Sequence, residues 1–350
     1  MQGRRMTEAQ NSVSRRLTIV DVAREANVSV KTVSRVLNDQ KGVGETTRQR
    51  VRDIMNSMGY QINKAARDLR LNRPTLVALV LDNPTTHMSA YNADLQIGAM
   101  RACNKMGYYL IVDDFGSQEC IFEEILENPD LAGMIIAPSL ADNFNMLNTL
   151  DKRGIPYVRI APQSEIDRSC SVLIDDKSAA YELGEHLLEL GHTRIGIIKG
   201  HPQHRVSEIR YQGVVEAFSS VGISIDPKLV LQSFFDFKSG MEAAAKLLCL
   251  PDRPTAIVAA NDDVAAAVVA VAAKKGIKVP EQLSVVGFDN SPISQSIYPS
   301  LTTVNQPVID MSRIAAELLI TGALSGEEQT RRVELDYEVV FRDSTSQLRN

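Results

Sequence analysis

The sequence predicts a small all-α head followed by a much larger α/β core built from two doubly wound units. Up to residue 72 the chain carries short amphipathic helical segments. From Leu76 onward, short β-branched runs alternate with helical segments over roughly 260 residues, which is too long for one modest sheet. Charge divides at the same place, because residues 1–72 hold 14 Lys and Arg against 7 Asp and Glu, and the remainder holds 24 against 36. A basic head on an acidic body is typical of nucleic-acid binding by the head alone.

The first helical segment begins after Thr18, in the stretch TIVDVAREANVSVKTVSRVLN. Thr18 is suited to cap this helix, with Asp21 three residues later near the positive end of the helix dipole. Asn27 is expected to adopt the left-handed conformation that ends the helix. Small apolar residues are predicted to form its inward face: Val20, Ala23 and Ala26.

The second helical segment starts at Ser29, which we expect to cap it. Its side chains divide into Val33, Val36 and Leu37 pointing inward and a short, polar, cationic outer face of Val30, Lys31, Ser34 and Arg35. The two segments therefore predict a helix-turn-helix, whose second helix enters the major groove of DNA. A plain helical hairpin with a solvated basic face is the simpler alternative.

A third helix is expected from about Glu45, after a loop at Asp39–Gly44, with Gly59 as its stop. Its apolar face would close a small core over the first two helices: Val51, Ile54, Met55 and Met58. The head then spans residues 17–62, behind a disordered basic tail at residues 1–16. Residues 63–73 contain NKAARDLR, which is either a plain linker or a hinge helix that places Leu69 between base steps of the minor groove.

In the core, nine apolar runs are predicted to form parallel sheets buried on both faces. Amphipathic helices lie between them, such as Lys177–Leu190, which stops at Gly191. Two similar sheets with a cleft between them suit this length, and neither GxGxxG nor GxxxxGK[ST] supports a dinucleotide or P-loop site. The predicted strands are Leu76–Leu81, Tyr109–Val112, Gly133–Ala137, Tyr157–Ile160, Ser171–Ile174, Ile195–Lys199, Leu229–Gln232, Ala256–Ala259 and Ser284–Phe288.

Cysteine usage and hydropathy indicate a cytoplasmic protein without membrane contact. The four cysteines (Cys103, Cys120, Cys170 and Cys249) show no CxxC spacing, which is typical of reduced, mostly buried thiols. Residues 1–16 contain four arginines and no apolar run, so they are not a signal peptide. No stretch reaches the about 18 apolar residues that a membrane span needs.

The sequence resembles the lactose/galactose repressor (LacI/GalR) family of bacterial transcription factors from about Leu17 to Thr345. The most specific stretches are TIVDVAREANVSVKTVSRVLN, AARDL, IDDKSAAYELGEHLLELGHTRIGII and VPEQLSVVGFDNSPIS. The resemblance implies a helix-turn-helix head, a hinge helix, and a periplasmic-binding-protein-like core at 74–345. Its N-subdomain would comprise about 74–175 plus 306–333, and its C-subdomain about 176–305 plus 334–345, with three crossings between them. The absence of a terminal leucine-heptad helix favours a homodimer.

By this resemblance, several residues of the head and hinge would contact double-stranded operator DNA. Arg35 is the expected base reader, because arginine bidentate to guanine is the commonest specific contact. Val30 and Lys31 stand where similar repressors place variable specificity residues. Ala66 and Leu69 belong to the hinge, and Leu69 would wedge into the central step of a palindromic operator. Phosphate contacts are expected from Thr18, Ser29, Ser34 and Asn38.

Ligands of open α/β sheets bind beyond the carboxyl ends of the strands, so an effector site is expected there. Arg210 and Asp289 align with the family's ligand-binding arginine and aspartate, and both suit vicinal hydroxyls. Ala161 stands where several relatives have a pocket aspartate, and the chain has no Trp, so stacking must use Tyr or Phe. Asp289 as a turn cap and Phe235 as plain core are the simpler alternatives. The expected effector-binding residues are Tyr91, Asn92, His204, Arg210, Phe235, Asn261 and Asp289.

These features predict a repressor of carbohydrate-utilisation genes that is modulated by a small sugar and uses no cofactor or metal. A phosphorylated sugar or a nucleobase is the alternative effector, and a sugar-binding transport receptor is a further alternative. His204 with Asp236 or Asp289 could also be imagined as the acid/base pair of a sugar enzyme, although nothing in the spacing favours it. A metal site at His201 and His204 lacks a third ligand beside them. The sequence leaves open whether the effector induces or co-represses.

Overall fold

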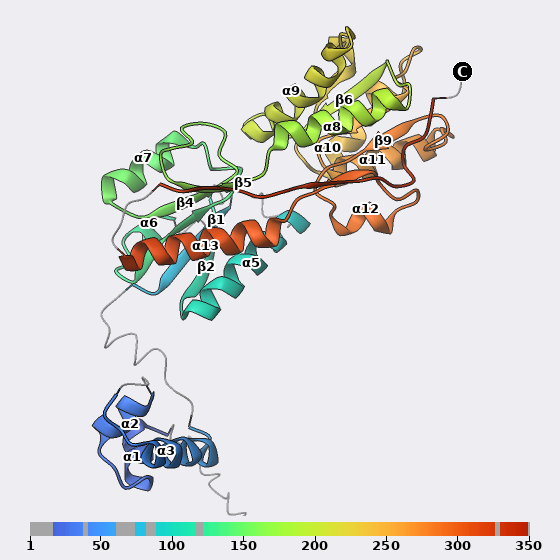
Figure 1. The fold of residues 1–350 in the computed structure, drawn as a ribbon. Helices are drawn as coiled ribbons and strands as arrows, with labels where there is room; N and C mark the ends of the chain where they lie inside the picture. The colour runs from blue at the N-terminus through green and yellow to red at the C-terminus, as the bar shows by residue number, and fades with distance from the viewer. Residues whose placement is uncertain are drawn as a thin grey trace, which may run out of the picture. The chain divides into compact units, whose positions relative to one another are not determined.

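The computed structural model describes residues 17–37, 41–60, 74–81, 89–115, 122–325 and 330–348 (Figure 1). The chain forms two compact units, at residues 1–72 and 73–350, and we describe each by itself. We call the first unit the head and the second unit the core. In the described residues, no helix has both the length and the apolar composition needed to cross a bilayer.

The head contains three helices, α1 (Ile19–Glu25), α2 (Val30–Leu37) and α3 (Glu45–Met58). The predicted cap of α1 is confirmed, because Thr18 Oγ1 accepts from the Asp21 amide while Asp21 Oδ2 accepts from the Thr18 amide at 2.9 Å. Asn27 has the expected left-handed backbone (φ 50°), and α3 ends at Gly59 (φ 64°). These local signals fix where each helix of the head begins and ends.

The predicted inward face of α1 is wrong at Val20, whose side chain is 49% exposed. The buried stripe instead follows Ile19, Val22, Ala23 and Ala26, which stand at i, i+3, i+4 and i+7 on one helix face. Val20 lies one residue off that stripe and therefore faces outward. The stripe packs against α2 and α3 through Val33, Val36 and Val51, so all three helices share one core.

The first sheet of the core is parallel and has the strand order β11-β5-β4-β3-β1-β2. Alternate residues of β1 face opposite helix layers, since Val77 and Leu79 belong to the cluster with α5 and α13 whereas Ala78 and Val80 belong to the cluster with α6 and α7. We call this sheet with its helices the first lobe. Its elements are β1 (Leu76–Leu81), α5 (Ala90–Met106), β2 (Tyr109–Asp114), α6 (Phe122–Leu126), β3 (Leu131–Ile136), α7 (Phe144–Arg153), β4 (Tyr157–Ile160), β5 (Cys170–Leu173), α13 (Val308–Ser325) and β11 (Arg332–Glu334).

The second sheet is also parallel, with the order β7-β6-β8-β9, and forms the second lobe with its helices. Helices α8 and α9 pair closely, because a Cβ on Gly213 would lie 2.2 Å from the Lys177 carbonyl oxygen. Helices α10 and α11 pair in a second layer. The elements are α8 (Asp176–Glu189), β6 (Ile195–Lys199), α9 (Arg205–Ser220), η1 (Pro227–Leu229), β7 (Val230–Gln232), α10 (Phe237–Leu247), β8 (Ala256–Ala259), α11 (Asp262–Lys274), β9 (Ser284–Val286) and α12 (Pro292–Ser296).

The chain passes between the two lobes three times: after β5, between β10 and α13, and between β11 and β12. Strands β10 (Thr303–Asn305) and β12 (Glu338–Val340) pair with each other antiparallel, outside both large sheets. The nine predicted strands are all present, with ends that shift by one or two residues. Strand β12 lies in the run YEVVFRDST, which the resemblance predicts to be the closing strand of the family. Short strands β10 and β11 were not predicted, because three residues carry little periodic signal.

Candidate functional site

The outer face of α2 is the candidate DNA-binding surface of the head. Val30 is 37% exposed, Lys31 is exposed, and Ser34 and Arg35 are half-buried, while Val33 and Val36 on the opposite face are buried. Two predicted phosphate contacts also cap helices, because Ser29 Oγ accepts from the Thr32 amide at 3.0 Å and Thr18 caps α1. The predicted DNA contacts Asn38, Ala66 and Leu69 lie outside the described residues.

A cavity of about 690 Å³ lies between the two lobes of the core. First-lobe residues lining it include Tyr91 and Asn92, which belong to the first turn of α5. Second-lobe residues follow the strands, as expected from the rule for open sheets. All seven predicted effector-binding residues therefore line one cavity: Tyr91, Asn92, His204, Arg210, Phe235, Asn261 and Asp289.

Arg210 is the centre of the polar floor of this cavity. Its Nε donates to Asp176 Oδ1 at 2.8 Å, and its Nη1 donates to the Ala260 carbonyl at 3.0 Å and lies 3.6 Å from Asp289 Oδ1. The guanidinium also lies over the Phe288 ring, 3.6 Å from its centroid, a cation–π contact. Gln306 Nε2 donates to Asp289 Oδ1 at 2.7 Å. The floor thus presents fixed acceptors and donors of the kind that grip paired hydroxyls.

Aromatic rings form one wall of the cavity. His201 and His204 stack with centroids 4.4 Å apart, and His204 stacks on Phe235 at 5.8 Å. Three non-glycine residues lining the cavity have a left-handed backbone: Ala161 (φ 49°), Phe235 (φ 63°) and Asp289 (φ 107°). Such strained backbone gathers at ligand sites, where the surrounding fold holds it in place.

The Phe235 ring is seated directly on Gly200, because a Cβ at that position would lie 2.0 Å from a ring carbon. We expect Gly200→Ala to displace the ring and to destabilise the core by about 1–3 kcal/mol, the usual cost of overpacking. Thermal denaturation of the full chain measures this. Gly322→Ala is the matched control, since no described atom lies within 4 Å of a Cβ there; an equal loss in both variants would contradict the argument.

Burial shifts several pKa values around the cavity. It raises the pKa of Asp289 to about 8, against the opposing effect of Arg210, and raises the pKa of Asp262 to about 6. It lowers the pKa of His204 to about 4, helped by the neighbouring His201. The Tyr91 hydroxyl also has a raised pKa, through burial and the charges of Asp289 and Asp176.

We expect the stability of the core to fall as pH rises from about 6.5 to about 8. In this window Asp289 is ionised in the unfolded chain but partly protonated in the folded one, so the folded state loses its proton-binding advantage as pH rises. Burial lowers the pKa of three histidines, His186, His192 and His204. These histidines make the stability rise with pH, but only below about pH 6.5, where the unfolded chain still binds their protons. Melting temperatures across the window should therefore fall less in Asp289→Asn than in the unmodified chain, and equal slopes would contradict this.

Sequence reasoning missed Asp176, Asp263, Ser291 and Gln306, which also line the cavity. The signal for Asp176 was available, because it follows β5 at the carboxyl edge, like the residues that were chosen. In the described part of the chain, no group of three or more His, Cys, Asp or Glu side chains could hold a metal ion.

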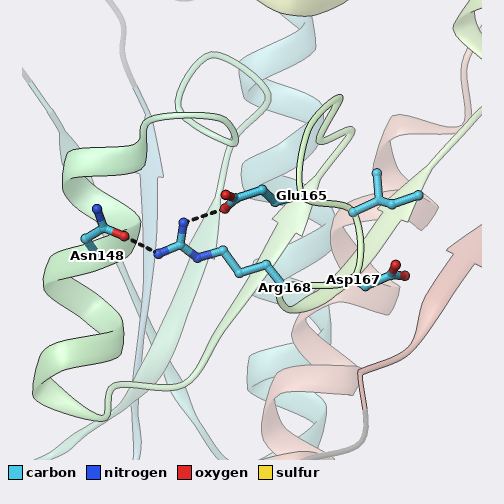
Figure 2. A pocket seen from close by; sticks show the side chains of 5 residues that line it. Asn148, Glu165, Asp167 and Arg168 are labelled. Carbon is cyan, nitrogen blue, oxygen red and sulfur yellow. Dashed lines mark hydrogen bonds and ion pairs between the residues drawn. The ribbon is translucent and has the colours of Figure 1, made fainter.

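A second hollow, of about 610 Å³, lies on the first lobe beside Arg168 (Figure 2). The Arg168 guanidinium already forms ion pairs with Asp151 at 2.6 Å and Glu165 at 2.6 Å, and it donates a hydrogen bond to Asn148. The hollow therefore offers a ligand little unused hydrogen-bonding capacity. The inter-lobe cavity, with its convergent polar floor and aromatic wall, is the better candidate for a ligand site.

Comparison with known proteins identifies the family to which the head and the core belong. The family model for bacterial regulatory proteins of the lacI family matches residues 18–63, and that for the periplasmic binding protein-like domain matches residues 185–345. The transcriptional regulator DegA of Bacillus subtilis is 35% identical over 344 residues, covering 95% of this chain and 98% of DegA. The chain belongs to the LacI family.

Two further LacI family relatives support this assignment. The transcriptional repressor CytR of Escherichia coli is 32% identical, over 95% of this chain and 97% of CytR. The solved complex of the transcriptional regulator CelR with cellobiose superposes with a TM-score of 0.73 at 29% identity, over 94% of this chain and 100% of CelR. The predicted fold is confirmed, and this LacI family member is a DNA-binding transcriptional regulator and not an enzyme.

Proposed function

We propose that this LacI family regulator represses carbohydrate-utilisation genes by binding a palindromic operator as a dimer, and that a small sugar in the inter-lobe cavity modulates it. The main support for a sugar effector is the floor of the cavity, where Arg210 pairs with Asp176 and lies beside Asp289. Charged groups of this kind make strong paired hydrogen bonds with hydroxyls. Phe235 and His204 add flat surfaces for the apolar face of a sugar ring.

The charge of the cavity favours a neutral effector over a phosphorylated one. Four aspartate side chains line it (Asp176, Asp236, Asp263 and Asp289), against the two basic side chains of Arg210 and Lys238. Arg210 is already paired with Asp176, so a phosphate would compete with a carboxylate for this guanidinium. The exposed Arg205 does not line the cavity, and its guanidinium lies 5.9 Å from the Phe144 ring centroid.

The proposed mechanism is a linkage between the two units. A sugar that contacts both lobes stabilises one relative placement of them, and it changes operator affinity only by its differential affinity for the two states. The hinge at residues 63–73 would transmit this change, and the N-subdomain (74–175 plus 306–333) and C-subdomain (176–305 plus 334–345) would move against each other. Induction and co-repression are the same linkage with opposite sign.

The test combines ligand screening with operator binding. Thermal shifts of the full chain against mono- and disaccharides, sugar phosphates and nucleobases identify the effector class, since a ligand at 100 times its Kd stabilises by about 2.7 kcal/mol. Duplexes selected from random sequence by binding to the protein give the operator. Fluorescence anisotropy with and without the ligand found in the screen then measures how much that ligand changes operator affinity. A hit confined to phosphates or nucleobases would overturn the sugar proposal, and an operator without two-fold symmetry would overturn the dimer.

On DNA, we assign direct base readout to Arg35 and specificity contacts to Val30 and Lys31. Arg35→Ala is expected to cost about 1–3 kcal/mol of operator affinity and to relax discrimination at one base position. Arg24→Ala removes the same charge from exposed α1 and is the control. Loss of a positive charge that reads no base should lower the affinity for all duplexes equally. Affinities for duplexes carrying single-base changes measure both effects, and unchanged discrimination in Arg35→Ala would remove it from base readout.

A further inference from the structure

One residue that lines the inter-lobe cavity has a side-chain oxygen with no hydrogen-bond partner among the described residues. Asp176 is the first residue of α8, its side chain is 1% exposed, and it lines the cavity beside Arg210. Its Oδ1 accepts from Arg210 Nε, whereas its Oδ2 is buried and has no hydrogen-bond partner among the described residues. Buried polar atoms are nearly always hydrogen-bonded in native proteins, so an exception in a cavity points to a missing ligand group.

The neighbouring polar side chains Asp175, Asp289 and Asn261 already have hydrogen-bond partners, in contrast to Asp176 Oδ2. Asp175, the preceding carboxylate, caps α8 through both oxygens, at 3.0 Å from the Ser178 amide and 2.6 Å from its hydroxyl. Asp289 receives Gln306, and Asn261 caps α11 while donating to the Phe235 carbonyl at 3.0 Å. Burial raises the pKa of Asp176, as expected for a carboxylate short of solvating donors.

We propose that Asp176 is an effector-binding residue whose Oδ2 accepts a hydrogen bond from a hydroxyl or ammonium group of the ligand. This inference rests on the proposed function and narrows the effector class. While Asp176 is ionised in its ion pair with Arg210, the ligand group at this point must be a donor, because a phosphate or carboxylate oxygen would face a buried carboxylate oxygen. Two carboxylates, Asp176 and Asp289, also share one guanidinium, so the floor as a whole favours donors.

The test compares Asp176→Asn with Asp175→Asn, two neighbouring substitutions that remove the same charge. Asparagine at 176 keeps an oxygen for Arg210 but replaces the unpartnered acceptor by an NH₂ donor, while asparagine at 175 still caps the helix. The probes are glucose, galactose, mannose, ribose, cellobiose and glucosamine, with glucose 6-phosphate as the anionic probe. Kd values come from calorimetry on the full chain, after melting curves show that both variants are folded.

For any sugar that binds the unmodified chain, we expect Asp175→Asn to bind normally and Asp176→Asn to bind about 10- to 100-fold more weakly. Equal binding by Asp176→Asn would overturn this inference while the proposed function stands. Binding of glucose 6-phosphate alone would overturn both the donor requirement and the neutral-sugar effector. If no probe shifts the unmodified chain, the proposed function fails, and this inference fails with it.

A ligand-side measurement on the unmodified chain covers the case in which Asp176→Asn does not fold, because the proposed contact is contradicted if no single hydroxyl of the sugar proves important for binding. Replacing each hydroxyl of the bound sugar by fluorine removes a donor but leaves a weak acceptor. We expect one fluorinated position to bind the unmodified chain at least about tenfold more weakly. In a folded Asp176→Asn variant, that same position should cost little more, because the two changes remove one contact. Full additivity of the two losses would contradict the proposed contact.

Discussion

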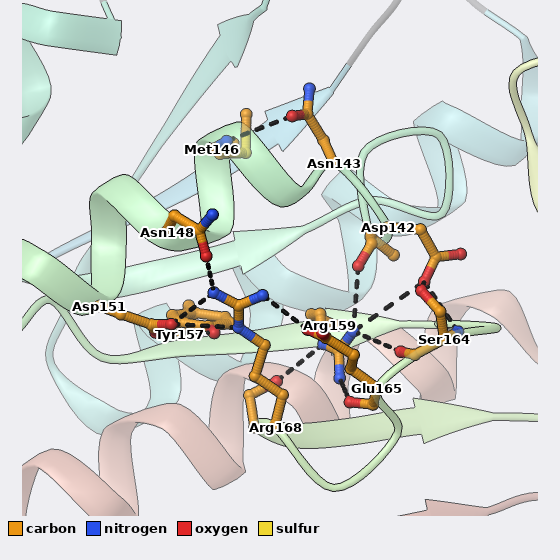
Figure 3. A network of polar contacts seen from close by, with 12 residues as sticks. Asp142, Asn143, Met146, Asn148, Asp151, Tyr157, Arg159, Ser164, Glu165 and Arg168 are labelled. Atoms are coloured by element: carbon orange, nitrogen blue, oxygen red, sulfur yellow. Dashed lines mark hydrogen bonds and ion pairs between the residues drawn. The ribbon is translucent and has the colours of Figure 1, made fainter.

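Arg159→Met is expected to destabilise the core by about 3–5 kcal/mol, the usual consequence of removing one partner from a buried charged network. Arg159 lies within β4 and its side chain is fully buried. It donates to Ser169 Oγ at 2.9 Å and to the carbonyls of Ala141 at 3.2 Å, Ser164 at 2.9 Å and Glu165 (Figure 3). Methionine fills much of the volume but donates to none of these acceptors. The Glu165 carbonyl keeps the Arg168 amide and the Ser169 hydroxyl keeps the Cys170 carbonyl, whereas the carbonyls of Ala141 and Ser164 would lose the donor that Arg159 supplies.

Urea denaturation of the full chain measures this loss, and Arg168→Met is the matched control. Arg168 lies in the same network, but its partners Asp151 and Glu165 are about half-exposed, so water can replace the arginine. We expect a clearly smaller loss for Arg168→Met. Similar losses in the two variants would show that the contribution of Arg159 to the free energy of unfolding does not depend on its burial.

Arg210→Ala is expected to raise the Kd for the effector by about 100-fold or more and to leave operator binding insensitive to it. The substitution removes the donor that faces the ligand and also strips Asp176 and Asp289 of their shared cation, so the core should lose stability as well. Calorimetry measures the sugar, and anisotropy measures the operator complex with and without sugar.

Lys199→Ala is the control for Arg210→Ala. Lys199 pairs with Glu208 of α9 at 3.0 Å, but it does not line the cavity. Its loss should leave both sugar affinity and the operator response unchanged. A normal sugar response in Arg210→Ala would remove this residue from the proposed effector site.

The sequence predicted what depends on local signals. Thr18, Asn27 and Gly59 mark helix ends through capping chemistry and backbone preference, and these act within a few residues. The rule that ligands bind at carboxyl strand edges also placed His204 and Asp289 in one cavity, because parallel strands bring their ends together.

The remainder depends on contacts that no local pattern contains. Arg159 stands inside the run YVRI, where it would be expected to interrupt a buried strand, and its burial depends on acceptors supplied by the loop that follows. The pairing of Asp176 with Arg210 depends on α9, which brings together two residues that are 34 positions apart in the sequence. Val20 was misplaced because the short α1 offers only two turns from which to judge the phase of the helix.

The three passages of the chain between the lobes constrain how this regulator could change its effector during evolution. The first lobe draws on β1–β5, α13 and β11, and the second lobe is inserted between them. The first lobe is therefore not encoded by one continuous stretch of gene, whereas the second lobe runs without interruption from α8 to α12. A single recombination event cannot exchange the whole first lobe, and a truncation after β10 would remove α13 and β11 from it. New effector preferences on the first-lobe side of the cavity would then arise by point substitutions.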